Sequence, residues 1–321
     1  MGNPTDMQNR PVFIFAIHRF GGTLLTRLLN CHPDLVIWGE HAGFINKLAD
    51  ADFLIRSCSD ALPEHSVEEL HRYFAFGEDC QRDFSPWMNP FASSEFGERC
   101  RDLLLTMYSR GQADKRWGFK EIRYHRPLVA AFLQRLFPEA RFILLVRDPI
   151  ELCISNVLVD WSLERVLARG GGNSRASFLE VVEDCLYAIV AIRSNFAKLE
   201  EMIGTECIII HYEHLINAPL FEYRRVLDFL QLQPNPLLFQ NVKNVLESVT
   251  GATLNRQTST HPLLNEQQIR STCASLLDGV VRKIREEGID RARLMGTAQK
   301  GRFSFLLGDL SESEPHISSM F

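Results

Sequence analysis

The sequence lacks the features that mark several large classes of protein. No apolar run approaches the roughly 20 residues that a membrane-spanning helix needs, and the polar N-terminus has no hydrophobic segment of the secretory type. No long run of lysine and arginine occurs, and a net charge of −5 with a pI near 6.1 argues against general nucleic-acid binding. We find neither internal repeats nor low-complexity tracts. These absences predict a soluble cytoplasmic protein with no nucleic-acid or membrane partner.

The cysteines lack the spacing that is typical of a metal site or a disulfide framework. The eight cysteines are scattered, and no Cys-x-x-Cys pair occurs, so the sequence indicates neither a zinc knuckle nor a disulfide framework. Reduced thiols in a cytosolic protein are the simplest interpretation. His211 and His214 lie three residues apart but have no evident third ligand, so we expect no metal site.

Hydrophobic residues make up 45% of the 321-residue chain, which is enough for a substantial core. Continuous apolar runs at 12–17, 141–146 and 207–211 predict buried strands of a parallel sheet, with shorter strands at 35–38 and 116–123. Helical periodicity between the strands predicts right-handed crossovers. We therefore predict a single α/β domain over 1–321, with a P-loop-like parallel sheet flanked by helices on both faces. A helical and loop insertion after the second strand covers about 50–115, and C-terminal helices and a tail cover about 234–321.

The first predicted strand leads into a tight turn, His18-Arg-Phe-Gly-Gly22, and then into a helix beginning at Thr23. A glycine-containing turn at a helix N-terminus exposes backbone N–H groups, and the helix dipole favours negative charge there. Arg19 adds a positive charge that suits phosphate or sulfate oxygens. No Lys-Ser or Lys-Thr pair follows the glycines, so the turn predicts an anion site but is not a Walker A loop.

Polar residues follow the other predicted strands, at the edge where ligands bind in open α/β sheets. They are Glu40 and His41, Lys120 and Glu121, Arg147 with Ser155 in the next helix, and Tyr212. Taken alone, Glu40 is more simply explained as the N-cap of a helix over 42–48. Glu121 is likewise more simply explained as an ion-pair partner of Arg123 or Arg116.

Together these motifs resemble the sulfotransferases that use PAPS (3′-phosphoadenosine-5′-phosphosulfate). The family's phosphosulfate loop, P-[RK]-S-G-T-T-L-L, is similar to residues 18–25, and its V-R-D-P motif with a following serine is similar to residues 146–149 with Ser155. A weaker match, to R-Y-E-D-L…P, covers residues 210–215 with Pro219. The resemblance spans about 11–232. Residues 29–40 are most similar to the tyrosylprotein sulfotransferases and related bacterial enzymes.

The resemblance implies a role for each site residue. Glu40 would be the general base, and Lys120 and Arg19 would stabilise charge on the leaving group. The turn would hold the 5′ end of the nucleotide through the backbone amides of Phe20, Gly21, Gly22, Thr23 and Leu24, with Arg19 adding its positive charge. Arg147 and Ser155 would bind the 3′-phosphate, and Tyr212 would pack against the adenosine. The turn departs from the family pattern, because Phe20 and Gly22 replace two hydroxyl residues and His18 replaces the usual proline.

The expected reaction is in-line transfer of a sulfuryl group from PAPS to a hydroxyl or amine, with PAP as product and no metal. A small metabolite, such as a specialised natural product, is the default acceptor. Two other classes stay open. One is a P-loop nucleotide kinase or related phosphotransferase, which would need ATP and magnesium. The other is a non-catalytic nucleotide-binding protein, which Phe20 and Gly22 make credible. Glu121 and His41 stay open as alternative bases. A homodimer also stays open as the oligomeric state.

Overall fold

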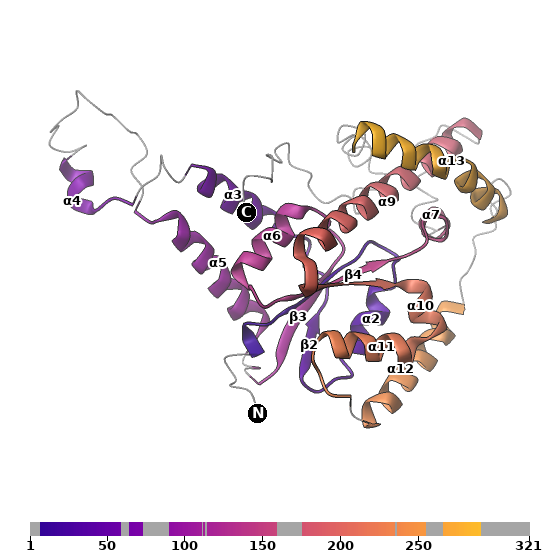
Figure 1. The fold of residues 1–321 in the computed structure, drawn as a ribbon, viewed down its shortest axis with the longest axis horizontal. Helices are drawn as coiled ribbons and strands as arrows, with labels where there is room; N and C mark the ends of the chain where they lie inside the picture. The colour runs from indigo at the N-terminus through magenta and orange to yellow at the C-terminus, as the bar shows by residue number, and fades with distance from the viewer. Residues whose placement is uncertain are drawn as a thin grey trace.

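The structure is a computed structural model that describes residues 7–58, 64–72, 90–110, 112, 114–158, 175–234, 236–254 and 266–289. In these residues five parallel strands form one sheet in the order β2-β3-β1-β4-β5 (Figure 1). The strands are β1 (Val12–Phe15), β2 (Leu35–Trp38), β3 (Arg116–Glu121), β4 (Arg141–Val146) and β5 (Cys207–His211). The predicted fold class is confirmed, and the predicted tail beyond residue 289 lies outside the described residues.

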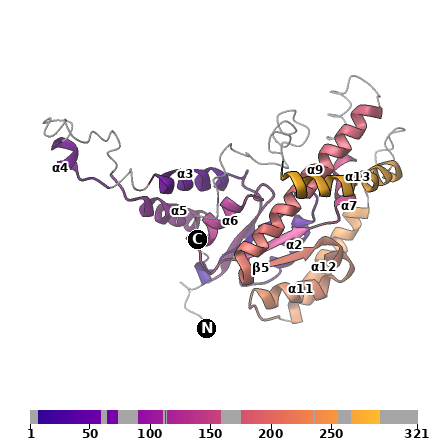
Figure 2. The ribbon, with the colours of Figure 1, turned by 45° about the horizontal axis from the view of Figure 1, so that its top comes forward.

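Helices cover both faces of the sheet, as the crossovers of a parallel sheet require. Figures 1 and 2 show one group on one side, comprising α2 (Gly22–Leu29), α10 (Tyr212–Asn217), α11 (Pro219–Phe229) and α12 (Pro236–Leu254). The other side carries α6 (Pro127–Leu136) and the long α9 (Arg175–Ile203). Helices α7 (Pro149–Val157) and α13 (Glu266–Glu287) pack on α9.

The insertion after β2 is helical, as predicted. It contains α3 (Ile45–Ser57), α4 (Val67–Leu70) and α5 (Ser93–Tyr108). Helices α3 and α5 pack on each other and on α6, whereas α4 lies far from the sheet in Figure 1. A capping box explains why α4 begins where it does: Ser66 accepts from the Glu69 N–H, and Glu69 accepts from the Ser66 N–H.

Element boundaries differ from the sequence prediction at several points. The first strand ends at Phe15 and not at residue 17: the Ala16 N–H still donates to the Glu121 carbonyl at 3.3 Å, and the turn over 18–21 leads into α2. The sequence predicts C-terminal helices without their bounds, and the described residues of that region form α12 and α13. Val242 of α12 is fully buried, and α12 packs against α2.

The centre of the core contains a cluster of aromatic side chains, from β1, β3 and β4 and from the end of α6. The ring of Phe13 lies 4.8 Å from that of Phe119 and 5.4 Å from that of Phe142, with Trp117 and Phe137 also in contact. All five side chains are buried, so the centre of the sheet is a fixed platform for the turns at its edge.

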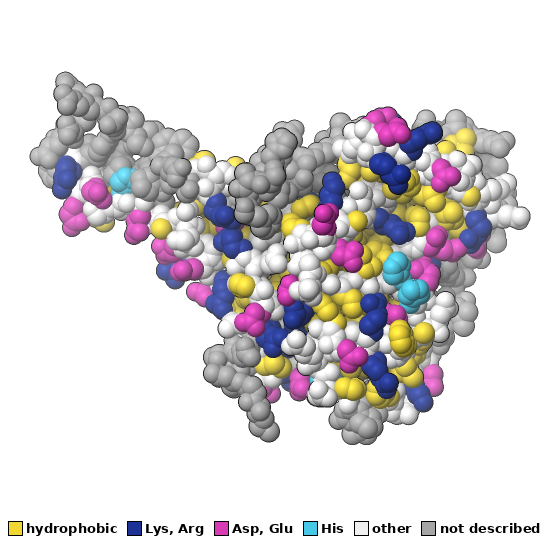
Figure 3. Space-filling model, in the orientation of Figure 1, with side chains coloured by type: hydrophobic (Ala, Val, Ile, Leu, Met, Phe, Trp, Pro, Cys, Tyr) yellow, Lys and Arg dark blue, Asp and Glu magenta, His cyan; other side chains and the backbone are white. Residues whose placement is uncertain are grey.

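The charge distribution on the surface and the free cysteine thiols are typical of a globular protein. On the face drawn in Figure 3, positive and negative side chains are interspersed over the described residues. The seven cysteines in the described ranges are free thiols. None of the helices in those ranges is both long enough and apolar enough to cross a bilayer.

Gly118 provides a test of the strand spacing. A Cβ added there would lie 2.1 Å from the Val12 carbonyl oxygen and 2.9 Å from Cδ1 of Ile37. Because β1 cannot move away without losing its ladder to β3, we expect Gly118→Ala to lower the free energy of unfolding by about 2–4 kcal/mol in urea denaturation. Gly279→Ala in α13 is the matched control, because nothing lies within 4 Å of its added Cβ. Equal stability of the two variants would contradict this packing.

Candidate active site

The predicted site residues lie together because all five strands point the same way. Phe15 pairs with Glu121 on one side and with Leu144 on the other, and Val146 pairs with His211. The turns that follow these residues therefore meet at one edge of the sheet, which is the edge where ligands bind in such folds.

The turn after β1 forms the centre of this edge. Phe20 is fully buried in the core, and its N–H donates to the Ile17 carbonyl at 3.1 Å. Because the Phe20 N–H already has a partner within the turn, it is not available to an anion. The remaining candidates among the predicted amides are those that follow Phe20. The amides of Gly22, Thr23 and Leu24 occupy the first turn of α2, where an α-helix has no carbonyl to offer them.

Each glycine of the turn is approached by a side chain from another element. A Cβ on Gly22 would lie 3.1 Å from Cδ of Lys120, so the lysine side chain passes over the start of α2. A Cβ on Gly21 would lie 2.3 Å from Cδ2 of Tyr212, and Gly21 has a left-handed φ of 87°. Gly21 is therefore needed both for the close approach of Tyr212 and for its backbone conformation, whereas a side chain at Gly22 would require Lys120 to move by a few tenths of an ångström.

Arg147 and Ser155 lie on the other side of the same turn. Arg147 donates from Nη1 to the Arg19 carbonyl at 2.9 Å, and its guanidinium lies 4.5 Å from the centroid of the Tyr212 ring. Arg19 has a left-handed φ of 71°, and its Nε donates to Oγ of Ser155 at 3.3 Å. The structure therefore groups the Arg19 side chain with Arg147 and Ser155.

The rest of the Arg147 motif holds that residue in place. Asp148 is the N-cap of α7, where its side chain accepts from the N–H groups of Ile150 and Glu151. The Asp148 N–H in turn donates to Oε1 of Glu213 at 2.8 Å. Glu213 belongs to the third sequence motif, so this bond joins the end of β4 to the end of β5.

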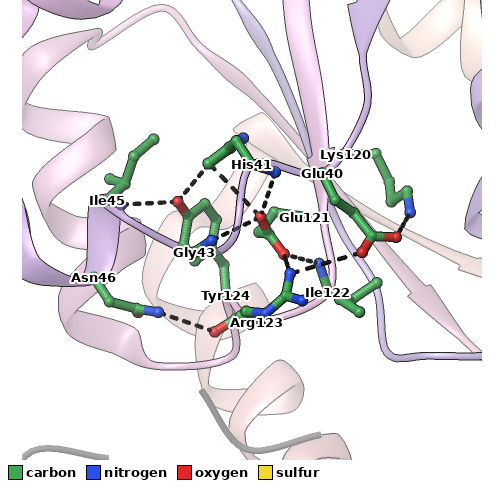
Figure 4. A network of polar contacts seen from close by, with 10 residues as sticks. All are labelled: Glu40, His41, Gly43, Ile45, Asn46, Lys120, Glu121, Ile122, Arg123 and Tyr124. Atoms are coloured by element: carbon green, nitrogen blue, oxygen red, sulfur yellow. Dashed lines mark hydrogen bonds and ion pairs between the residues drawn. The ribbon is translucent and has the colours of Figure 1, made fainter. Parts of the chain in front are cut away.

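Glu40 and Lys120 form an ion pair beside the start of α2 (Figure 4). The lysine side chain is nearly enclosed, whereas the Glu40 side chain is 37% exposed. Nη1 of Arg123 lies 3.7 Å from the second Glu40 oxygen. Helix α3 begins at Ile45 with Phe44 in the N-cap position, so the interpretation of Glu40 as an N-cap is wrong.

Glu121 is fully buried, which separates it from Glu40. Its carboxylate accepts from the N–H groups of His41 at 2.9 Å, Gly43 at 3.0 Å and Ile122 at 2.9 Å, and from Nη1 of Arg123 at 2.6 Å. Burial alone would raise its pKa, but the hydrogen bond from His41 and the positive charge of Arg123 hold the pKa of Glu121 below its ordinary value. The predicted ion pair with Arg123 is present, and a carboxylate so enclosed cannot take a proton from an incoming molecule.

His41 is also enclosed. Its ring contacts the rings of Phe44, Tyr108, Phe119 and Tyr124, and Nε2 lies 2.5 Å from the Tyr124 hydroxyl. Burial lowers the pKa of His41 to about 4, although Glu121 acts in the opposite direction. Of the three candidate bases predicted from the sequence, Glu40 is therefore the most exposed to solvent.

Two residues of this edge were named in the sequence analysis but were not assigned to the site. Arg123 bridges Glu40 and Glu121, and its place two residues beyond Glu121 was the available signal. His18 lies close enough to Arg19, Glu40 and Lys120 for their charges to affect it, and burial together with Arg19 lowers the pKa of His18. Within the described ranges, no cluster of three or more potential metal ligands occurs.

A sequence profile of the sulfotransferase family matches residues 11–236, whereas no curated protein sequence matches the chain. Among solved structures, the chain is similar to the sulfotransferase domain from the curacin biosynthetic pathway, at 17% identity and a TM-score of 0.45, over 83% of this chain and 97% of that one. It is also similar to the sulfotransferase domain of the Synechococcus PCC 7002 olefin synthase, at 19% identity and a TM-score of 0.44, over 83% of this chain and 94% of that one. Mouse sulfotransferase SULT7A1 complexed with PAP matches at 11% identity and a TM-score of 0.40, over 91% of this chain and 83% of that one. With TM-scores below 0.5, these structures carry no further argument.

The enclosure of His41 predicts an acid-dependent loss of stability. Because its pKa is about 4 in the folded protein and 6.5 in an unperturbed imidazole, the unfolded chain binds more protons between these values. The free energy of unfolding should therefore fall as the pH is lowered from 6.5 to 4, by on the order of 2 kcal/mol from this group. Urea denaturation across this range should give a shallower fall for His41→Gln. Equal slopes in the two proteins would show that His41 is not buried in its neutral form.

Proposed function

The chain belongs to the sulfotransferase family, and we propose that it transfers the sulfuryl group of PAPS to a hydroxyl or amine of a small-molecule acceptor. The observation that carries this proposal is the position of the Glu40–Lys120 ion pair, beside the first turn of α2 and over Gly22. A base, a cation and a set of unpaired backbone amides are thereby within one small region.

The residues present fit a nucleotide with phosphate at both ends. In our proposal the amides of Gly22, Thr23 and Leu24 bind the 5′-phosphosulfate, where the dipole of α2 also favours negative charge. Arg147 and Ser155 bind the 3′-phosphate, and Arg19 joins them because it already contacts Ser155. The Tyr212 ring, between Gly21 and Arg147, lies where it can pack against the adenosine.

The reaction needs a proton acceptor on one side of the sulfur and a cation on the other. We assign the first role to Glu40, which takes the proton of the acceptor hydroxyl or amine as the new bond to sulfur forms. The bond between sulfur and the bridging oxygen breaks at the same time, and Lys120 stabilises the charge that develops on this oxygen. The exposure of the three candidate bases supports this assignment, because Glu121 and His41 are enclosed and Glu40 is not.

The donor assignment is tested by calorimetric titration with PAP and with ATP, with and without magnesium. We expect PAP to bind without magnesium, and Arg147→Ala to weaken this binding about 10- to 100-fold, because a charge-assisted contact to phosphate is lost. Arg99→Ala is the matched control, since Arg99 is exposed and pairs only with Glu95 among the described contacts. Binding of ATP with magnesium, without binding of PAP, would reject the proposal in favour of a phosphotransferase.

The assigned roles of Glu40 and Lys120 are tested by turnover. With radiolabelled PAPS and pools of candidate metabolites, Glu40→Gln and Lys120→Ala should each lower the rate of transfer by about 100- to 1,000-fold. Glu139→Gln provides a control, because Glu139 is exposed and pairs with Arg10 away from this site. Near-normal turnover in either site variant would remove the role assigned to that residue. The same screen identifies the acceptor.

A further inference from the structure

We infer that Glu121 is a positioning residue for this reaction, which fixes the backbone after Glu40 and keeps Arg123 from pairing fully with the Glu40 carboxylate. The inference rests on the proposed role of Glu40 as the base. It concerns a group that cannot touch the substrate, because the Glu121 side chain is 0% exposed.

The first part of the inference follows from the turn after Glu40. Ala42 and Gly43 both have left-handed backbone conformations, with φ values of 60° and 71°. This turn directs the N–H groups of His41 and Gly43 to the same oxygen of Glu121. A left-handed alanine is unfavourable by itself, so the two hydrogen bonds to a buried carboxylate are what hold the turn.

Tyr124 fixes the other end of the same segment. Its hydroxyl accepts from the Ile45 N–H at 3.0 Å and lies next to Nε2 of His41. The segment 41–45 is thus attached at three amides to the side chains of Glu121, the last residue of β3, and Tyr124, three residues later (Figure 4). Because Lys120 also belongs to β3, one strand end positions both members of the Glu40–Lys120 pair.

The second part of the inference concerns the charge around Glu40. Nη1 of Arg123 lies 2.6 Å from Glu121 and 3.7 Å from Glu40, so it binds Glu121 more closely (Figure 4). Glu40 also faces Lys120 from β3 and is near His18 from the turn after β1. A second full cation pair would make a carboxylate a poorer proton acceptor, so the hold of Glu121 on Arg123 preserves the basicity that the reaction needs.

Two substitutions should move the pH dependence of the reaction in opposite directions. In Glu121→Gln the amide can accept at one end only, so either the Arg123 contact or the turn loses its acceptor. In both cases the negative charge that holds Arg123 is gone, so Arg123 can pair more closely with Glu40. The acid limb of the pH–rate profile should therefore move to lower pH, by on the order of half a unit, with at least a tenfold lower maximal rate. In Arg123→Met one cation near Glu40 is lost, and the acid limb should move to higher pH by a similar amount.

The measured rate is the release of labelled sulfate from radiolabelled PAPS, with water as the acceptor, so no natural acceptor is required. The affinity for PAP should stay within about twofold of wild type in both variants, since neither residue is assigned to the nucleotide. Glu222→Gln is the matched control: Glu222 is a buried carboxylate paired with Arg225 on α11, and its loss should leave the limb unshifted.

Unshifted acid limbs in both variants, or shifts in the same direction, would overturn the inference. If Glu121→Gln does not fold, Arg123→Met decides alone. Failure of the proposed function is seen separately, as a wild-type protein that neither binds PAP nor releases sulfate. In that case amide hydrogen exchange tests whether Glu121 holds the turn after Glu40. His41 and Gly43 should exchange at least about tenfold faster in Glu121→Gln, while α2 is unchanged, and equal rates would overturn the positioning role.

Discussion

The approach of two side chains to a glycine backbone is the constraint on which the rest of this site depends. Lys120 passes over Gly22, where a Cβ would be a tight fit, and Tyr212 lies on Gly21, at a distance that leaves no room for a Cβ. These contacts bring the ends of β3 and β5 onto the turn after β1. The cation near Glu40 and the arginine near Ser155 thereby lie on two sides of the same turn.

Burial sorts the ionisable groups of this edge into different tasks. Glu121 is enclosed and saturated with donors, so it holds backbone in place. His41 is enclosed by aromatic rings and stays neutral at pH 7. Glu40, only three residues before Gly43, is open to solvent and retains one oxygen that no close donor occupies in the described contacts. Similar chemical groups therefore differ in what they can do because of their surroundings.

The sheet and most of the site could be predicted from the sequence, because apolar runs mark buried strands and the edge of a parallel sheet collects whatever follows them. Side-chain direction could not be predicted. From the sequence, Phe20 was a residue that lacks the hydroxyl of the family's loop. In the structure its side chain is fully buried and anchors the turn in the core. Arg19 contacts Ser155 because of its left-handed backbone, which spacing alone does not reveal. The enclosure of Glu121 depends on the turn at Ala42, which carries no sequence signal.

The central claim is that this edge holds a nucleotide at both ends, and a crystal structure of the chain with PAP tests it most directly. The account predicts the 5′-phosphate within hydrogen-bonding distance of the amides of Gly22 to Leu24, and the 3′-phosphate in contact with Arg147 and Ser155. PAP bound elsewhere, or with its 3′-phosphate away from Arg147, would contradict the account.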